Sequence, residues 1–405
     1  MTEARLVLAS VSAPPVKVIN TLQSSYDIPD PLPWSQIAGP LAAAEDALAR
    51  LDERLAKSPI RDGWTSRTHF SDAAACLWLE GELVHLEDLV LHDAGMDVRA
   101  PTHELIRAHA VLRARRRIAD ERPAWALSPA GLAGLRGRGG HADREQGSGD
   151  DIEDRDGEIR ADDADDNAEL DATPGVIATD DRLADAFAAV DAAISKTNRT
   201  LAGETCEPAR RRQERDPLVY DLDWDEDGYL DAWRAVVDES RNLPPTLAAA
   251  IAAEAWQAIA PLQHTPWLGR LLAASVLRER GKARWHLPCL HYGLKAVPRE
   301  RRRPRDGGAR LAIQLEAIAA AAAAGLKDHD RWLTARTLLT RKLNGRRSTS
   351  RLPALVDYVM SRPIVSAGMI ADELGITPRA AQDLVSELGL RETTGRGRYR
   401  AWGVL

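Results

Sequence analysis

Apolar residues recur at spacings of three and four along most of the chain, which is the period of an amphipathic α-helix. In the first third of the chain, such stripes predict helices over 41–55, 79–90 and 102–122. Thr102 begins the third stripe, where its hydroxyl can accept a hydrogen bond from a backbone N–H of the first turn. Residues 1–133 are therefore predicted to form an N-terminal helical region.

The helical period returns in the second half of the chain. It predicts a helix over 181–201 and another that begins at Pro245. Two further apolar stripes predict a pair of helices that Gly325 and Gly345 terminate. We assign 176–345 to a helical core, because strand-like alternation is confined to the last dozen residues of the chain.

Residues 134–175, between these two regions, have a different composition. They are rich in Gly and Asp and nearly lack large apolar side chains, so they cannot bury enough surface to offset the entropy of ordering. The pattern predicts an acidic disordered linker. The alternative is that this acidic run mimics DNA or competes for the basic surface of a partner.

The overall charge restricts the kind of partner that the chain can bind. A net charge of -7 argues against coating nucleic acid or membrane by bulk charge, so any such binding requires a local basic patch. Cys76, Cys206 and Cys289 show no paired spacing, which is typical of a reducing compartment. The apolar run before Pro14 is too short for a signal peptide or a membrane span. We therefore expect a cytoplasmic protein with no membrane partner.

Two groups of metal-binding residue types fail the spacing that a metal site needs. The carboxylates of "DLDWDEDGYLD" alternate as in a calcium loop, but in neither register do a glycine at the sixth position and a glutamate at the twelfth occur together. His286, Cys289 and His291 lie close together without a fourth ligand nearby, which is a poor tetrahedral set for zinc. No P-loop or dinucleotide fingerprint occurs either. We predict no metal and no cofactor.

Residues 346–405 carry the strongest pattern in the chain. Ser366 is placed to cap a helix that Gly375 ends with a tight turn, and Thr377 is placed to cap the next helix, with Pro378 at its first position. Two short strands joined by a Gly-Arg-Gly turn follow. This order predicts a winged helix-turn-helix with a recognition helix of about eleven residues.

The outward face of that recognition helix carries side chains that can bind DNA. Arg379 and Gln382 are suited to reading bases, with Ser386 as an auxiliary contact and Thr377 at the helix N-terminus. Three arginines of the wing are suited to phosphate contacts: Arg396, Arg398 and Arg400. The alternative is that the winged helix serves as a rigid spacer or as a protein docking module.

Four stretches of the chain together resemble the layout of Fic-domain proteins. They are "ALARLDERLAKSP", "WLEGELVHLEDL", "HTPWLGRLL" and "TTGRGRYRAW". The same order also resembles an uncharacterised bacterial family that joins a domain of unknown function to a helix-turn-helix. The resemblance implies a mainly α fold, in which a Fic-like helical bundle is interrupted by the acidic linker and followed by the winged helix.

In Fic proteins a histidine accepts a proton, an acid holds magnesium and a glycine cradle binds phosphate. The resemblance makes His264 the histidine, but the acid and the glycine cradle are absent after it. Glu80-Gly81 is similar to the inhibitory motif of the family, and we expect Glu80 to cap a helix or pair locally. We therefore predict a non-catalytic body, with nucleotide transfer to protein through His264 as the alternative.

The leading hypothesis is a bacterial transcriptional regulator that binds double-stranded DNA through the winged helix. Recognition of two half-sites predicts a homodimer, and the helical body would sense an unknown effector or provide the dimer interface. The third hypothesis is a scaffold or antitoxin-like protein whose acidic linker occupies a basic groove of its partner.

Overall fold

The computed structural model describes residues 26–96, 100–136, 224–343, 350–394 and 400–404. The chain divides into two units, one formed by 1–142 with 225–405 and the other by 143–224. All elements given below belong to the first unit. The helix predicted over 181–201 and residues 137–175 of the predicted linker lie outside the described residues.

The described part of the predicted N-terminal region is helical. Thr102 Oγ1 accepts a hydrogen bond from the N–H of Leu105 over 3.3 Å, so the predicted cap is confirmed. Asp93, at the end of the third helix, binds Arg116 in the fourth. The elements are α1 (Trp34–Ala56), α2 (Arg61–Glu80), α3 (Leu86–Asp93), α4 (His103–Asp120), the 3-10 turn η1 (Trp125–Leu127) and α5 (Pro129–Leu135).

A second series of helices follows and shares one apolar core with the first series. The elements are α7 (Glu226–Glu239), η2 (Ser240–Asn242), α8 (Pro245–Ile259), α9 (Leu268–Glu279), α10 (Leu290–Ala296), η3 (Arg299–Arg301) and α11 (Gly307–Arg341). The helix predicted to begin at Pro245 is thus confirmed. The sequence pattern separates residues 1–133 from residues 176–345. In the structure, the described parts of both share one core, and we call them together the helical body.

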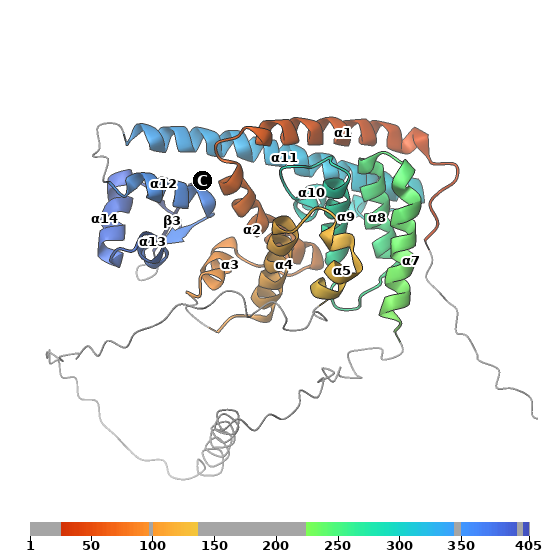
Figure 1. The fold of residues 1–405 in the computed structure, drawn as a ribbon, viewed down its shortest axis with the longest axis horizontal. Helices are drawn as coiled ribbons and strands as arrows, with labels where there is room; N and C mark the ends of the chain where they lie inside the picture. The colour runs from red at the N-terminus through yellow and green to blue at the C-terminus, as the bar shows by residue number, and fades with distance from the viewer. Residues whose placement is uncertain (1–25, 97–99, 137–223, 344–349, 395–399, 405) are drawn as a thin grey trace, which may run out of the picture. The chain divides into compact units, whose positions relative to one another are not determined.

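The helices α1 and α11 run side by side in the same direction (Figure 1). Near their starts, the backbone of Gly308 lies against Gln36, and near the end of α1, Ser58 Oγ lies 2.8 Å from His329 Nε2. Helix α11 is long and apolar enough to span a bilayer, but half of its most apolar window is buried inside the protein. It therefore serves as a core helix of the body.

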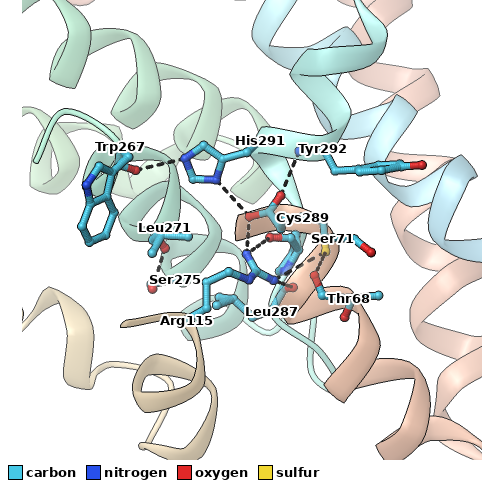
Figure 2. Close-up of polar contacts among 12 residues, drawn as sticks. Thr68, Ser71, Arg115, Trp267, Leu271, Ser275, Leu287, Cys289, His291 and Tyr292 are labelled. Atoms are coloured by element: carbon cyan, nitrogen blue, oxygen red, sulfur yellow. Dashed lines mark hydrogen bonds and ion pairs between the residues drawn. The ribbon is translucent and has the colours of Figure 1, made fainter. Parts of the chain in front are cut away.

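A buried polar cluster joins α2, α4 and α10 (Figure 2). Arg115 Nη1 and His291 Nδ1 lie 2.6 and 2.9 Å from the same oxygen of Asp72, and the N–H of Tyr292 donates to the other oxygen over 2.8 Å. Burial by itself raises the pKa of Asp72, but Arg115 and His291 outweigh that effect and hold the pKa at about 2. His291 Nε2 also lies 3.1 Å from the carbonyl oxygen of Trp267. The cluster therefore fixes three helices around one carboxylate.

The C-terminal residues form the predicted winged helix. Its elements are α12 (Leu352–Ser361), β1 (Val365–Ser366), α13 (Ala367–Leu374), α14 (Pro378–Leu388), β2 (Arg391–Glu392) and β3 (Ala401–Gly403). The strands pair antiparallel in the order β1-β3-β2, so a short strand before α13 joins the two strands of the predicted wing. The mainly α fold with a C-terminal winged helix-turn-helix is confirmed.

Two sequence predictions about helices are wrong. The helix predicted over 79–90 does not exist, because α2 ends at Glu80 and Gly81 adopts a left-handed φ of +92° before α3 begins. The two helices predicted around Gly325 are one helix, α11. Gly325 lies inside it because a Cβ there would stand 3.0 Å from the side chains of Leu51 and Trp64. This glycine permits close helix packing and does not end a helix.

Candidate nucleic-acid interface

Helix α14 is positioned by local signals at both of its ends. Gly375 ends α13 with a φ of +60°, a conformation that glycine adopts without strain. Thr377 Oγ1 accepts a hydrogen bond from the N–H of Ala380 over 3.2 Å, and Pro378 occupies the first turn. Gly389 then ends α14 with a φ of +62°. The predicted helix-turn-helix geometry is therefore encoded locally.

The two faces of α14 differ sharply in polarity. Ala381, Val385 and Leu388 are buried against the rest of the winged helix. The opposite face is exposed and includes four of the predicted contact residues: Thr377, Arg379, Gln382 and Ser386. Within the described part of the chain, the side chains of Arg379 and Gln382 form no hydrogen bond or ion pair. These donor groups are thus available to a ligand.

Of the three arginines predicted on the wing, only Arg400 is among the described residues. Arg400 is exposed, and its Nη2 lies 2.6 Å from Glu392 Oε2 on the neighbouring strand. Its guanidinium also lies 5.6 Å from the ring centre of Trp402. Arg396 and Arg398 lie outside the described residues. A phosphate at Arg400 would therefore compete with Glu392 for the guanidinium.

A buried arginine of the body holds the winged helix in place. Arg67 in α2 is 3% exposed, and its Nη2 donates to the carbonyl oxygens of Pro363 and Val404 over 3.1 and 3.0 Å. Its guanidinium lies 4.8 Å from the ring centre of Trp332 in α11. Burial lowers the pKa of Arg67 to about 10. Sequence reasoning missed this residue, because its partners lie about 300 positions further along the chain and leave no local pattern.

Two further contacts tie the winged helix to the body. Asp93 at the end of α3 binds Arg116 through both oxygens, at 2.6 and 2.9 Å, and Arg362 at 3.2 Å. Burial by itself raises the pKa of Asp93, but the two guanidinium groups lower it overall. Lys342, just after α11, donates from Nζ to the carbonyl oxygen of Leu388 at the end of α14, over 2.7 Å. A cation at this position also suits the helix dipole.

The stretch that resembles a Fic motif has a packing role in this structure. His264 is exposed in the loop between α8 and α9. A Cβ on Gly269 would stand 2.1 Å from the indole of Trp256, so this glycine allows α9 to pack on that ring. Glu80, the last residue of α2, forms an ion pair with Arg107 in α4. The resemblance to Fic proteins is itself untested and stays a prediction.

The three residues considered for zinc do not converge on one point. His291 is occupied by Asp72 and a carbonyl oxygen, while Cys289 lies 3.5 Å from Arg115 Nη2. His286 Nδ1 lies 3.8 Å from Asp52, too far for a hydrogen bond. In the described ranges, no group of three or more His, Cys, Asp or Glu residues could hold a metal ion.

Together, the fold and the exposed face of α14 define a helical protein that carries a winged helix-turn-helix DNA-binding domain. Comparison with known families agrees: a model described as "HTH DNA binding domain" matches residues 352–405, and one described as "Protein of unknown function (DUF1612)" matches residues 218–344. The "Uncharacterized protein y4cF" of Sinorhizobium fredii is 46% identical over 385 residues, which cover 90% of this chain and 96% of that protein. The chain belongs to the family of this relative, with a DUF1612 region followed by a helix-turn-helix domain. The predicted resemblance to a family of this composition is confirmed.

Proposed function

We propose that this chain is a cytoplasmic bacterial transcriptional regulator that binds double-stranded DNA as a homodimer. The observation that carries the proposal is the exposed face of α14. There, Arg379 and Gln382 project from a capped recognition helix without partners in the described residues. In a major groove, an arginine fork suits guanine and a glutamine amide suits adenine.

The other predicted contacts have supporting roles in this proposal. Thr377 and Ser386 flank the base-reading pair on the same helix, and Arg400 with Arg396 and Arg398 would contact phosphates from the wing. The homodimer follows from specificity, because two half-sites give a longer recognition sequence than one recognition helix can read. We assign the helical body the task of sensing an effector or providing the dimer interface.

Selection of genomic fragments with the purified full-length chain tests this proposal. We expect enrichment of a palindromic sequence. Arg379→Ala and Gln382→Ala should each relax preference at one base position of both half-sites and weaken specific binding by about 1–3 kcal/mol. Arg234→Ala on α7 is a control, because it removes an arginine outside the winged helix.

Two results would contradict the proposal. The first is a selection that enriches no sequence, which would point to docking or spacing by the winged helix. The second is a recovered sequence that the Arg379 and Gln382 variants bind with unchanged affinity and unchanged base preference.

A further inference from the structure

A strongly basic segment lies in the body, outside the winged helix. Residues 295–310 contain seven arginines and lysines and two acidic residues, although the whole chain is acidic. Arg299, Arg303 and Arg305 are exposed and form no ion pair or hydrogen bond through their side chains within the described residues. We call these three side chains the η3 arginines, after the 3-10 turn η3 in which the first of them lies and which the other two follow.

The backbone that carries the η3 arginines is fixed. Arg302 donates from Nε to the carbonyl oxygen of Val297 over 2.8 Å and from Nη2 to that of Lys295 over 3.0 Å. Val297 is buried, and Asp306 caps the start of α11 by accepting the N–H of Ala309. The three cations are therefore presented on a braced turn, which lowers the entropy cost of binding an anion.

The neighbouring aromatic residue indicates which form of nucleic acid this surface suits. Trp78 is 37% exposed, but Lys295 Nζ and the Arg302 guanidinium lie 5.0 and 4.8 Å from its ring centre. The ring is thus engaged by cations, whereas binding of single strands relies on free aromatic faces that stack on bases. Guanidinium groups without a stacking platform suit the phosphates of a duplex.

The η3 arginines lie at the opposite end of α11 from the winged helix. They immediately precede Gly307, where α11 begins, while Lys342 at its other end contacts α14. A helix of 35 residues is about 50 Å long. That length equals about 15 base pairs of duplex, so a phosphate held here lies outside the half-site that α14 reads.

We propose that the η3 arginines form a second, sequence-independent contact with the phosphate backbone of duplex DNA. The inference rests on the proposed DNA-binding function and extends it to the body. Three phosphate contacts would release bound counterions without reading any base, and so they would strengthen binding to long duplexes and make it more salt-dependent.

The test measures binding of the full-length chain to a 60-base-pair duplex of random sequence at several salt concentrations. The variant is Arg299→Ala/Arg303→Ala/Arg305→Ala. We expect its plot of log affinity against log salt to be shallower by about 2.7, or about 0.9 for each phosphate. Between 50 and 200 mM salt, the unmodified chain should therefore lose about 40-fold more affinity than the variant.

Two matched variants separate this contact from general charge and from misfolding. Arg50→Ala/Arg234→Ala/Arg241→Ala removes three arginines elsewhere, each paired to an acid three or four residues before it, and should keep the original slope. A triple Arg→Lys variant of the η3 arginines keeps the charge and should restore most of the binding. An unchanged slope in the triple Ala variant, or an equal loss in the control, would overturn the inference.

The failure of this inference is distinguishable from failure of the proposed function. If Arg379→Ala weakens DNA binding while the η3 variant binds like the unmodified chain, only the second contact is wrong. If the unmodified chain binds no duplex at all, the proposed function itself is wrong. If the η3 arginines instead bind an acidic protein and the chain does not bind DNA, the unmodified chain would bind no duplex.

Discussion

One buried histidine is expected to contribute to the pH dependence of the stability of the body. His286 lies within the core with its side chain about 1% exposed, and its ring packs edge-on against Trp64. Neither ring nitrogen has a hydrogen-bond partner among the described residues. Burial, together with the nearby cations Arg115 and Arg278, lowers the pKa of His286 to about 4, although Asp52 acts in the opposite direction.

The sign of the effect follows from the two states of the chain. An unfolded histidine takes up a proton near pH 6.5, whereas folded His286 does so only near pH 4. The unfolded state therefore binds more protons between these values, so the free energy of unfolding falls as the pH is lowered through this window. From pH 7 to pH 5 the loss from this residue is about 2 kcal/mol.

Urea unfolding of His286→Phe at pH 7 and pH 5 measures this contribution. We expect the drop in the free energy of unfolding to be about 2 kcal/mol smaller in the variant than in the unmodified chain. His264→Phe replaces a histidine outside the core and serves as the control. Equal drops in all three proteins would show that His286 titrates normally.

At the scale of elements, the sequence pattern predicts helices well where their signals are local. The caps at Ser366 and Thr377 and the glycine at 375 define the helix-turn-helix, and all three act within four residues. The sequence pattern does not predict helix α2 over its true length, because its buried face includes polar side chains such as Arg67 and Asp72, which interrupt an apolar stripe. The sequence pattern divides α11 into two helices at Gly325, because it does not show that this glycine is there to pack against another helix.

The contrast between two helix-interior glycines tests that explanation. A leucine at Gly325 must push against Leu51 and Trp64, and overpacking of this kind costs about 1–3 kcal/mol. A leucine at Gly39 in α1 meets open space, but the ring of the following Pro40 offsets part of the gain in helix propensity, so the variant should gain less than about 1 kcal/mol.

Thermal unfolding distinguishes the two glycine variants. We expect Gly325→Leu to lower the melting temperature by several degrees and Gly39→Leu to leave it unchanged or raise it. If both leucines raised the melting temperature, Gly325 would have no packing role in α11.

At the scale of the molecule, one part of the candidate site can be predicted from the sequence and another cannot. The face of α14 could be predicted, because capping and the helical period together determine which residues point outward. The attachment of the winged helix to the body could not be predicted. Arg67 binds the backbone carbonyl oxygens of Pro363 and Val404, and a backbone contact does not depend on the residue type of the acceptor. In the proposed dimer, the orientation of α14 relative to the body would set the spacing of the half-sites.

Removal of the Arg67 guanidinium should therefore loosen the winged helix without unfolding the body. Arg67→Ala leaves two carbonyl oxygens without their donor, and a lost hydrogen bond to a charged group costs about 1.5–3 kcal/mol. Hydrogen exchange followed by mass spectrometry should show faster exchange over 352–404 and little change over 34–120. Arg61→Ala on the same helix is the control, because Arg61 pairs with its neighbour Asp62 and should leave both regions as they were.

The DNA-binding consequence of the same variant separates attachment from recognition. Arg67→Ala retains Arg379 and Gln382, so each half-site should still be preferred over unrelated sequence, while the preference for one half-site spacing should broaden. Binding to duplexes whose half-sites are moved apart by one base pair at a time measures that preference. A spacing preference as narrow as that of the unmodified chain would mean that Arg67 does not set the orientation of α14, and that Asp93 and Lys342 suffice to hold the winged helix.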